Sequence, residues 1–222
     1  MKEVIDFLNR LSENNNKPWF DAHKEEYKRA RACFENFVTE LIKEIESFDK
    51  SIYGLSVSDC TYRIYRDIRF SRDKTPYKTH MGAYICPKGK KSGLAGYYFH
   101  IESESRTYLP SHLLATGAVC LPKESIRSIR EDIYSLYDEF EQCVHEAEGF
   151  SLDTESSMKV VPKDFPKGTK ADNALKLRDF ILSKHIDDSY ILSSDLLGHL
   201  VHDFKKTKNF NDFINRAIKA EM

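Results

Sequence analysis

Apolar residues recur at helical spacing over the first fifty residues of the chain. A stripe of four aliphatic residues predicts an amphipathic helix over residues 2–12, which ends in the polar run 14–16. A second stripe, rich in aromatic residues, predicts a longer helix that continues to about residue 48. Asn16 is a suitable N-cap for this helix, and Pro18 is tolerated in its first turn.

Residues 62–80 change to a period of two. Ile64, Ile68 and Phe70 alternate with charged and aromatic residues, which predicts a β-strand over residues 63–70 with these three side chains buried. Arg66 shares their face, so we expect it to have a charged or polar partner.

Two further extended runs flank a turn rich in Gly and Lys at residues 87–93. Residues 77–86 and 96–102 therefore predict a hairpin, and one or two more strands are expected within residues 106–120. Since no helical pattern separates these runs, the sheet should be mainly antiparallel.

Helical patterns return in the second half of the chain. The predicted elements are a helix over 122–146, a short strand at 158–161, a helix over 172–182 capped by Asp172, an extended segment at 187–192, a helix from Ser193 or Ser194 through Phe204, and a last helix from Asn209 through Ala220. The sequence thus predicts a single α+β domain over residues 1–222. Its parts are helices in 1–48, an antiparallel sheet in about 60–120, the 122–146 helix and a mixed, helical part in 149–222.

Charge is unevenly distributed along the chain. The net charge is only −1, which argues against a globally basic nucleic-acid-binding surface. Residues 62–91 nevertheless hold nine Lys or Arg and two Asp, a local charge of +7, and the remainder carries −8. Such segregation can direct an anionic partner to one face of a protein, although a solvated Lys-rich hairpin would show the same pattern.

No apolar run approaches the roughly 20 residues that a membrane span needs, and the N-terminus lacks the pattern of a signal peptide. The five cysteines are widely spaced and form no C-x-x-C pair, which favours reduced thiols. We therefore expect a cytoplasmic protein with no membrane partner.

The basic stretch has the chemistry for recognising phosphate or carboxylate groups. Guanidinium binds such groups bidentately, and ammonium binds them as a point charge. The candidate ligand-binding residues are Arg63, Arg66, Arg69, Lys74, Tyr77 and Lys78. Because aromatic side chains nearby can stack on bases, a nucleotide or single-stranded RNA is a reasonable partner. The tyrosines in question are Tyr62, Tyr65, Tyr77 and Tyr97.

Two alternatives stay open. A phosphoester hydrolase or transferase would need a base, charge stabilisers and a proton shuttle. Candidates for these roles are Asp67 or Asp73 as base or metal ligand, Arg69 and Lys74 as charge stabilisers, and His80 or His100 as shuttle. A purely structural or protein-interaction role is the other alternative. No metal site is assigned, because His199 and His202 on one helix supply only two ligands.

Several separated motifs resemble one known family. They are Asn-Asn-x-x-x-Trp-Phe at residues 14–20, Arg-Asp-Ile-Arg-Phe-Ser-Arg-Asp-Lys-Thr-Pro-Tyr-Lys at 66–78, the Gly117 to Pro122 approach to a helix containing Ile129-Arg130, and Pro-Lys-Gly at 166–168 before Leu-Lys-Leu-Arg-Asp-Phe at 175–180. Together they resemble the conserved hypothetical proteins of domain of unknown function family 2461. The resemblance implies a bacterial-type single domain and no established activity, cofactor or substrate.

Overall fold

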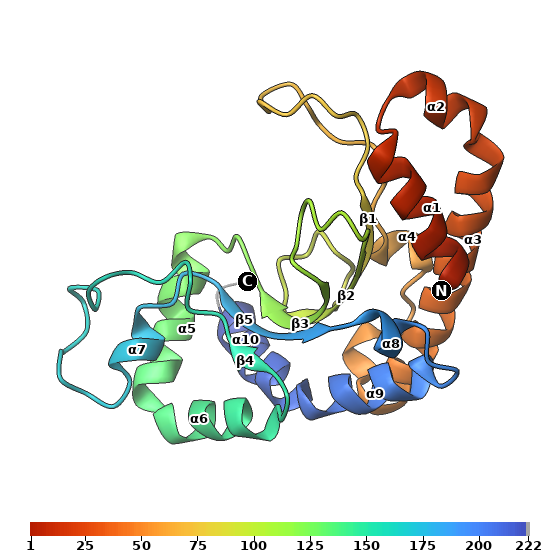
Figure 1. Ribbon diagram of the computed structural model, residues 1–222. Coiled ribbons are helices and arrows are strands. Elements are labelled where there is room, and N and C mark those ends of the chain that lie inside the picture. Colours follow the sequence, from red (N-terminus) through yellow and green to blue (C-terminus); the bar gives the residue numbers. More distant parts are fainter. Residues whose placement is uncertain (221–222) are drawn as a thin grey trace.

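A central antiparallel sheet organises the protein (Figure 1). The structure is a computed structural model that describes residues 1–220. Within these residues the sheet has five strands in the order β1-β2-β3-β5-β4. They are β1 (His80–Ile85), β2 (Gly96–Glu102), β3 (His112–Ala118), β4 (Ser151–Leu152) and β5 (Phe180–Ile186). The predicted α+β class and the antiparallel sheet are confirmed.

Along the chain, helices precede the sheet, lie between β3 and β5, and follow the sheet. They are α1 (Lys2–Glu13), α2 (Lys17–Ala22), α3 (Lys24–Phe48), η1 (Lys50–Ile52), α4 (Val57–Cys60), α5 (Lys123–Ser135), α6 (Tyr137–Glu146), α7 (Asp172–Leu175), α8 (Asp188–Ile191), α9 (Leu196–Lys206) and α10 (Lys208–Ala220). As predicted, Asn16 caps a helix, because its side-chain oxygen accepts a hydrogen bond from the Trp19 backbone N–H at 3.0 Å. The two long predicted helices are each broken once, at His23 and at Leu136. Among the described helices, none combines the length and apolar character that crossing a membrane requires.

The two faces of the sheet differ because side chains alternate along each strand. On β2, Tyr97 and Phe99 are buried against the helical layer: Tyr97 packs on Phe204 of α9 and Phe99 on Phe34 of α3. In Figure 1 helices α9 and α10 lie beneath the sheet, with α1–α3 on one side and α5–α7 on the other. None of the described helices lies over the middle of the opposite face, which is left open (Figure 1).

The strand predicted over residues 63–70 is wrong. These residues belong to a loop over 62–79 that protrudes beside β1 (Figure 1) and pairs with itself through an isolated bridge between Tyr65 and Tyr77. Ile64 is buried as predicted, but Ile68 is partly exposed and Phe70 is 96% exposed. The alternation fails as a guide here because no neighbouring sheet covers the loop, so only its base reaches the core.

The predicted hairpin is confirmed, with β1 beginning at His80 and β2 antiparallel to it. The C-terminal prediction needs several corrections. The predicted caps are wrong, because α7 begins at Asp172 itself, α9 begins after Asp195, and α10 begins at Lys208. Helix α7 ends at Leu175, and Phe180–Ile186 forms β5, which fills the sheet between β3 and β4. The segment at 158–161 is not a strand, whereas the unpredicted β4 is. The segment expected to be extended at 187–192 contains α8, because the Asp187 side chain caps it by accepting the Tyr190 backbone N–H at 2.9 Å.

Candidate functional site

The open face of the sheet forms a cleft of about 1420 Å³. Strands β1, β2, β3 and β5 supply its floor, and the 62–79 loop supplies one wall. Of the predicted site residues, those that line the cleft are Arg63, Arg66, Asp67, Asp73, Tyr77, Lys78 and His80. Arg69 and Lys74 do not line it. The fold therefore brings most of the predicted residues to one concave surface.

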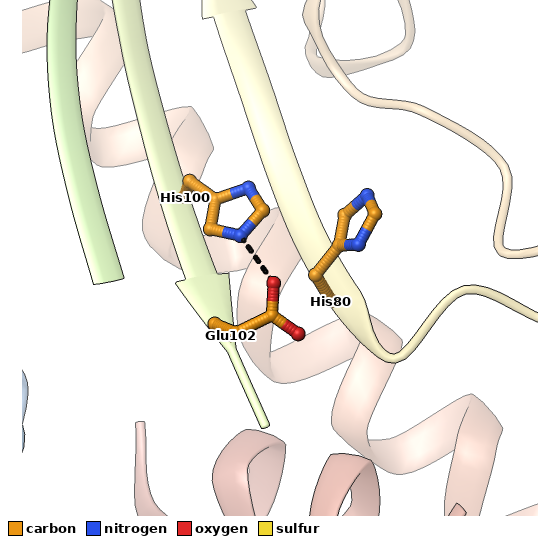
Figure 2. A group of neighbouring side chains, drawn as sticks. All are labelled: His80, His100 and Glu102. Atoms are coloured by element: carbon orange, nitrogen blue, oxygen red, sulfur yellow. Dashed lines mark hydrogen bonds and ion pairs between the residues drawn. The ribbon is translucent and has the colours of Figure 1, made fainter. Parts of the chain in front are cut away.

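Three titratable side chains meet at the end of this floor. His80 begins β1, His100 and Glu102 lie on β2, and the strand register places His80 opposite Glu102 (Figure 2). The His100 Nε2 lies 3.1 Å from the Glu102 carboxylate, and the centroids of the His80 and His100 rings are 4.7 Å apart. One potential ligand atom from each of the three residues lies within 4.8 Å of the other two.

This His80–His100–Glu102 group is enclosed. His100 and Glu102 are fully buried, and the exposed Tyr108 ring stacks on His80 with centroids 4.4 Å apart. The other nitrogen of His100, Nδ1, lies 2.9 Å from the Tyr98 hydroxyl. Gly82 leaves the room for that tyrosine, since a Cβ at Gly82 would lie 2.6 Å from the Tyr98 hydroxyl oxygen.

The Glu102 carboxylate is held by several donors. It accepts the Leu109 backbone N–H at 3.1 Å, and the Ser103 backbone N–H and the Thr79 hydroxyl at 3.3 Å each. Burial acts to raise the pKa of Glu102, but the hydrogen bond and charge of His100 and the charge of His80 outweigh it, so the pKa is lowered. The pKa of His80 is lowered to about 3 by burial and by the neighbouring His100. The buried Glu102 carboxylate is thus held by several donors, and burial disfavours the charged form of His80.

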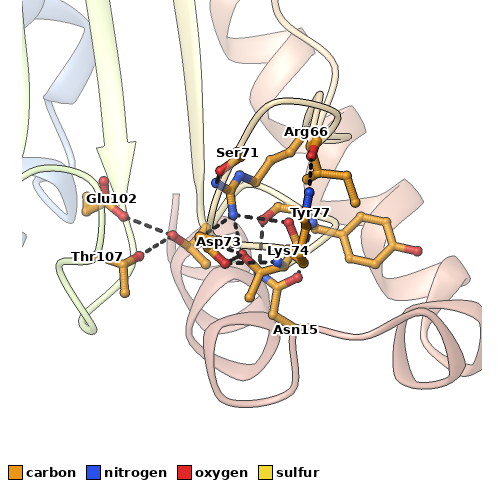
Figure 3. Close-up of polar contacts among 11 residues, drawn as sticks. Asn15, Arg66, Ser71, Asp73, Lys74, Tyr77, Glu102 and Thr107 are labelled. Carbon is orange, nitrogen blue, oxygen red and sulfur yellow. Dashed lines mark hydrogen bonds and ion pairs between the residues drawn. The ribbon is translucent and has the colours of Figure 1, made fainter.

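Arg66 organises the protruding loop (Figure 3). Its guanidinium donates to the Asp73 carboxylate, to the Thr75 hydroxyl and, at 3.1 Å, to the Thr75 carbonyl oxygen. The expected partner of Arg66 is thus Asp73, although the pair is not buried. The backbone N–H of Thr75, the Arg66 guanidinium and the Thr75 hydroxyl lower the pKa of Asp73 from 3.8 to about 2.

Asn15 ties the base of this loop to the helical part of the protein. Its side chain donates to the Tyr77 carbonyl oxygen at 2.9 Å and accepts the Tyr77 backbone N–H at 3.1 Å. The Tyr77 ring packs on Phe20, with centroids 4.0 Å apart, and is buried. Tyr77 thus anchors the loop, and its ring is already covered by protein.

Two basic side chains of the cleft wall lack an acidic partner. Among the described residues, neither Arg63 nor Lys78 forms an ion pair with a carboxylate. Lys78 is partly buried, and its pKa is lowered first by burial and then by the positive charge of Arg63. Its Nζ atom lies 5.4 Å from the centroid of the Tyr62 ring. Lys78 and Arg63 therefore repel one another at the cleft wall, although Arg63 also interacts with the Asp67 carboxylate, whose pKa it lowers.

The other predicted residues have local partners. Arg69 pairs with Asp67 at 2.7 Å on the exposed side of the loop, and Lys74 donates to the Ile68 carbonyl oxygen at 2.9 Å. The hydrogen bonds to Arg69 lower the pKa of Asp67. Tyr97, expected to stack on bases, faces the helices and donates to the Asp49 carboxylate at 2.9 Å, so it lies outside the cleft.

Sequence reasoning missed Glu102, Tyr98 and Tyr108, and it considered His100 only as a proton shuttle. The pair His100-x-Glu102 was a usable signal, because residues two apart on a strand share a face. Combined with the predicted hairpin, the register would have placed His80 beside them. Tyr108 lies in the connection after β2 and gave no periodic signal.

Fold and site together define an α+β protein whose antiparallel sheet has one open, cleft-forming face with a buried His–His–Glu group at its end. The model of the family of conserved hypothetical proteins called DUF2461 matches residues 3–213. The chain therefore belongs to the DUF2461 family, as its motifs indicated. Searches of curated proteins and of solved structures find no match to this chain.

Proposed function

We propose that the cleft binds a phosphate-bearing ligand of the nucleotide class, with the phosphate held between Arg63 and Lys78. The observation that carries this proposal is the unpaired state of these two cations in the described chain. Both side chains line the cleft, and the charge of Arg63 lowers the pKa of the partly buried Lys78, so their like charges repel. An anion that accepts bonds from both would relieve this repulsion.

Size and aromatic character favour a ligand larger than inorganic phosphate. The cleft of about 1420 Å³ has room for a nucleotide or a few nucleotides of a single strand. Tyr108 stacks on His80 and is 65% exposed, so an aromatic ring is available in the same cleft as Lys78. Stacking of a base on a tyrosine is worth about 1–3 kcal/mol and depends little on base identity.

The phosphoester hydrolase or transferase remains an alternative that no contact favours. Its proposed bases already have partners: Asp73 binds Arg66 and Thr75, and Asp67 binds Arg69. Their lowered pKa values make both carboxylates weaker bases than a free aspartate. The ligand-binding proposal needs no such base.

The test is a titration of the protein with ATP, AMP and inorganic phosphate, in which calorimetry and thermal unfolding measure the binding. Replacing Arg63 or Lys78 by Met removes the charge and keeps most of the aliphatic stem. Each replacement should weaken nucleotide binding by roughly 10-fold or more, since a hydrogen bond to a charged group contributes about 1.5–3 kcal/mol. Wild-type binding should also weaken as salt is raised.

Arg72→Met is the matched control, because Arg72 is exposed in the same loop and does not line the cleft. It changes the net charge equally and should leave the affinity within about 2-fold of wild type. Equal losses in all three variants would indicate non-specific attraction to the loop. Absence of nucleotide binding by the wild type at low salt would favour a structural or protein-interaction role.

We also infer that the chain folds as one domain and works in the cytoplasm. The single sheet against which helices from both ends of the chain pack supports the first inference, and five free cysteines support the second. A single cooperative unfolding transition and recovery in the cytoplasmic fraction would be the corresponding measurements.

A further inference from the structure

We propose that His80, His100 and Glu102 bind one divalent transition-metal ion of the zinc or iron(II) class. Two imidazoles and one carboxylate are a donor set that such ions prefer. The inference rests on the group itself and is independent of whether the cleft binds a phosphate-bearing ligand.

The spacing of two of the donor atoms suits a shared ion. Two ligand atoms that each lie about 2.1 Å from a metal, in tetrahedral or octahedral geometry, are roughly 3.0–3.4 Å apart. The His100 Nε2 and the Glu102 Oε2 are 3.1 Å apart, which falls in that range. His80 comes from the neighbouring strand (Figure 2), and one of its ring nitrogens lies within 4.8 Å of the other two donor atoms.

His80 supplies a second observation that points to a ligand. Its Nδ1 atom is buried and has no hydrogen-bond partner among residues 1–220. A buried polar atom without a partner is unfavourable by about 1–3 kcal/mol, so such atoms in proteins usually bind a water molecule, an ion or a ligand. A buried nitrogen without a partner, in a side chain next to a buried carboxylate, is what a bound cation would satisfy.

Tyr98 gives the supporting contact that a metal-binding histidine needs. Metal-bound histidines donate their second ring N–H to a neighbouring acceptor, which fixes the orientation of the ring. The Tyr98 hydroxyl, 2.9 Å from the His100 Nδ1, can accept that N–H when Nε2 holds a metal. Without a metal, the same hydroxyl can donate to Nδ1 while Nε2–H donates to Glu102. The hydroxyl therefore accommodates both forms of His100 without rearrangement.

The experiment uses the full-length chain, treated with a chelator and dialysed, and titrated with Co²⁺ as a spectroscopic probe and with Zn²⁺ in competition. We expect one Co²⁺ per chain, with visible absorption bands and no thiolate-to-cobalt band, because all three proposed ligands offer N or O atoms. This spectrum distinguishes the site from adventitious binding at the exposed Cys120. Zn²⁺ should displace the Co²⁺ signal.

His80→Ala is the first variant, because among residues 1–220 the His80 side chain makes no hydrogen bond that its loss would break. It should bind Co²⁺ about 100-fold or more weakly and keep the wild-type circular dichroism spectrum. Glu102→Gln should have the same effect and serves as the second variant. The control is His185→Ala, which removes a histidine of the same cleft that lies on β5 and outside the group.

Stoichiometric, tight binding in the wild type and the control, with its loss in both variants, would support the site. Two outcomes would overturn it: no Co²⁺ or Zn²⁺ bound by the wild type at about 0.1 mM free metal, or wild-type affinity retained in His80→Ala. If His185→Ala loses binding as well, the histidines act non-specifically and the proposal is wrong.

Discussion

Asn15 holds the protruding loop through two hydrogen bonds to the Tyr77 backbone, and its replacement by Ala should release the loop. The bonds are 2.9 Å and 3.1 Å long and partly buried. A neutral hydrogen bond contributes about 1 kcal/mol net, so Asn15→Ala should weaken the attachment by about 2 kcal/mol. That loss corresponds to a roughly 30-fold higher population of the detached loop.

Hydrogen exchange measures this effect directly. Three backbone N–H groups at the base of the loop report on it: Tyr77 donates to Asn15, Lys78 to the Ile64 carbonyl, and Arg66 to the Pro76 carbonyl. The Lys78 and Arg66 amides should exchange about 30-fold faster in Asn15→Ala if loop opening controls exchange. If the loss is transmitted to the whole fold instead, the melting temperature should fall by about 4–8 °C.

The neighbouring Asn14 provides a matched control. Its side chain makes one exposed hydrogen bond, to the Arg10 carbonyl within the last turn of α1. Asn14→Ala should leave the exchange rates of the loop amides unchanged, because the Asn14 side chain makes no hydrogen bond to the loop. Unchanged exchange and an unchanged melting temperature in Asn15→Ala would refute the idea that Asn15 fixes the loop.

Two further predictions concern the loop and the sheet. The pKa of Asp73 is lowered from 3.8 to about 2 in the folded loop, so the stability that its ionised form gives is complete above about pH 4 and is lost as the pH falls through 2. An NMR titration of the Asp73 carboxyl should therefore show a midpoint near 2. A midpoint near 3.8 would contradict the Arg66–Asp73–Thr75 contacts. Gly117→Ala should lower the free energy of unfolding by about 3 kcal/mol or more in urea titrations, because Gly117 has φ +110° and an added Cβ would lie 1.9 Å from the Phe180 carbonyl oxygen. Gly54→Ala, at φ +79° with nothing within 4 Å, should cost only about 1–2 kcal/mol, and equal losses would contradict the close approach of β3 and β5.

Local patterns predicted the elements whose neighbours lie close in the sequence. The N-cap at Asn16 and the β1–β2 hairpin depend on residues a few positions apart, and both were predicted correctly. The alternation through Ile68 and Phe70 was misleading, since a period of two shows which side chains share a face but not whether another strand covers that face. The end of α7 and the start of β5 were missed because the strand that pairs with β5 is β3, which lies more than sixty residues earlier in the chain.

In the site, too, local features could be predicted from the sequence, and features that depend on distant contacts could not. The basic residues of the loop could be identified from composition, whereas their separation into paired and unpaired cations depends on contacts such as that between Arg66 and Asp73. The group of His80, His100 and Glu102 depends on the register of two strands, which turn length and packing determine. A pattern read along one strand could identify two members of the group, and only the pairing identifies the third.

The order of the sheet has a consequence for synthesis of the protein. β3 pairs with β5 along all seven of its residues, from His112 with Ile186 to Ala118 with Phe180. At 5–20 residues per second, a ribosome needs roughly 3–14 s after completing β3 to complete β5. During that interval β3 is the edge of a three-stranded meander, with unpaired N–H and C=O groups and few charges to discourage a second chain from pairing there. A chain truncated before β5 would keep that edge permanently and should self-associate through it.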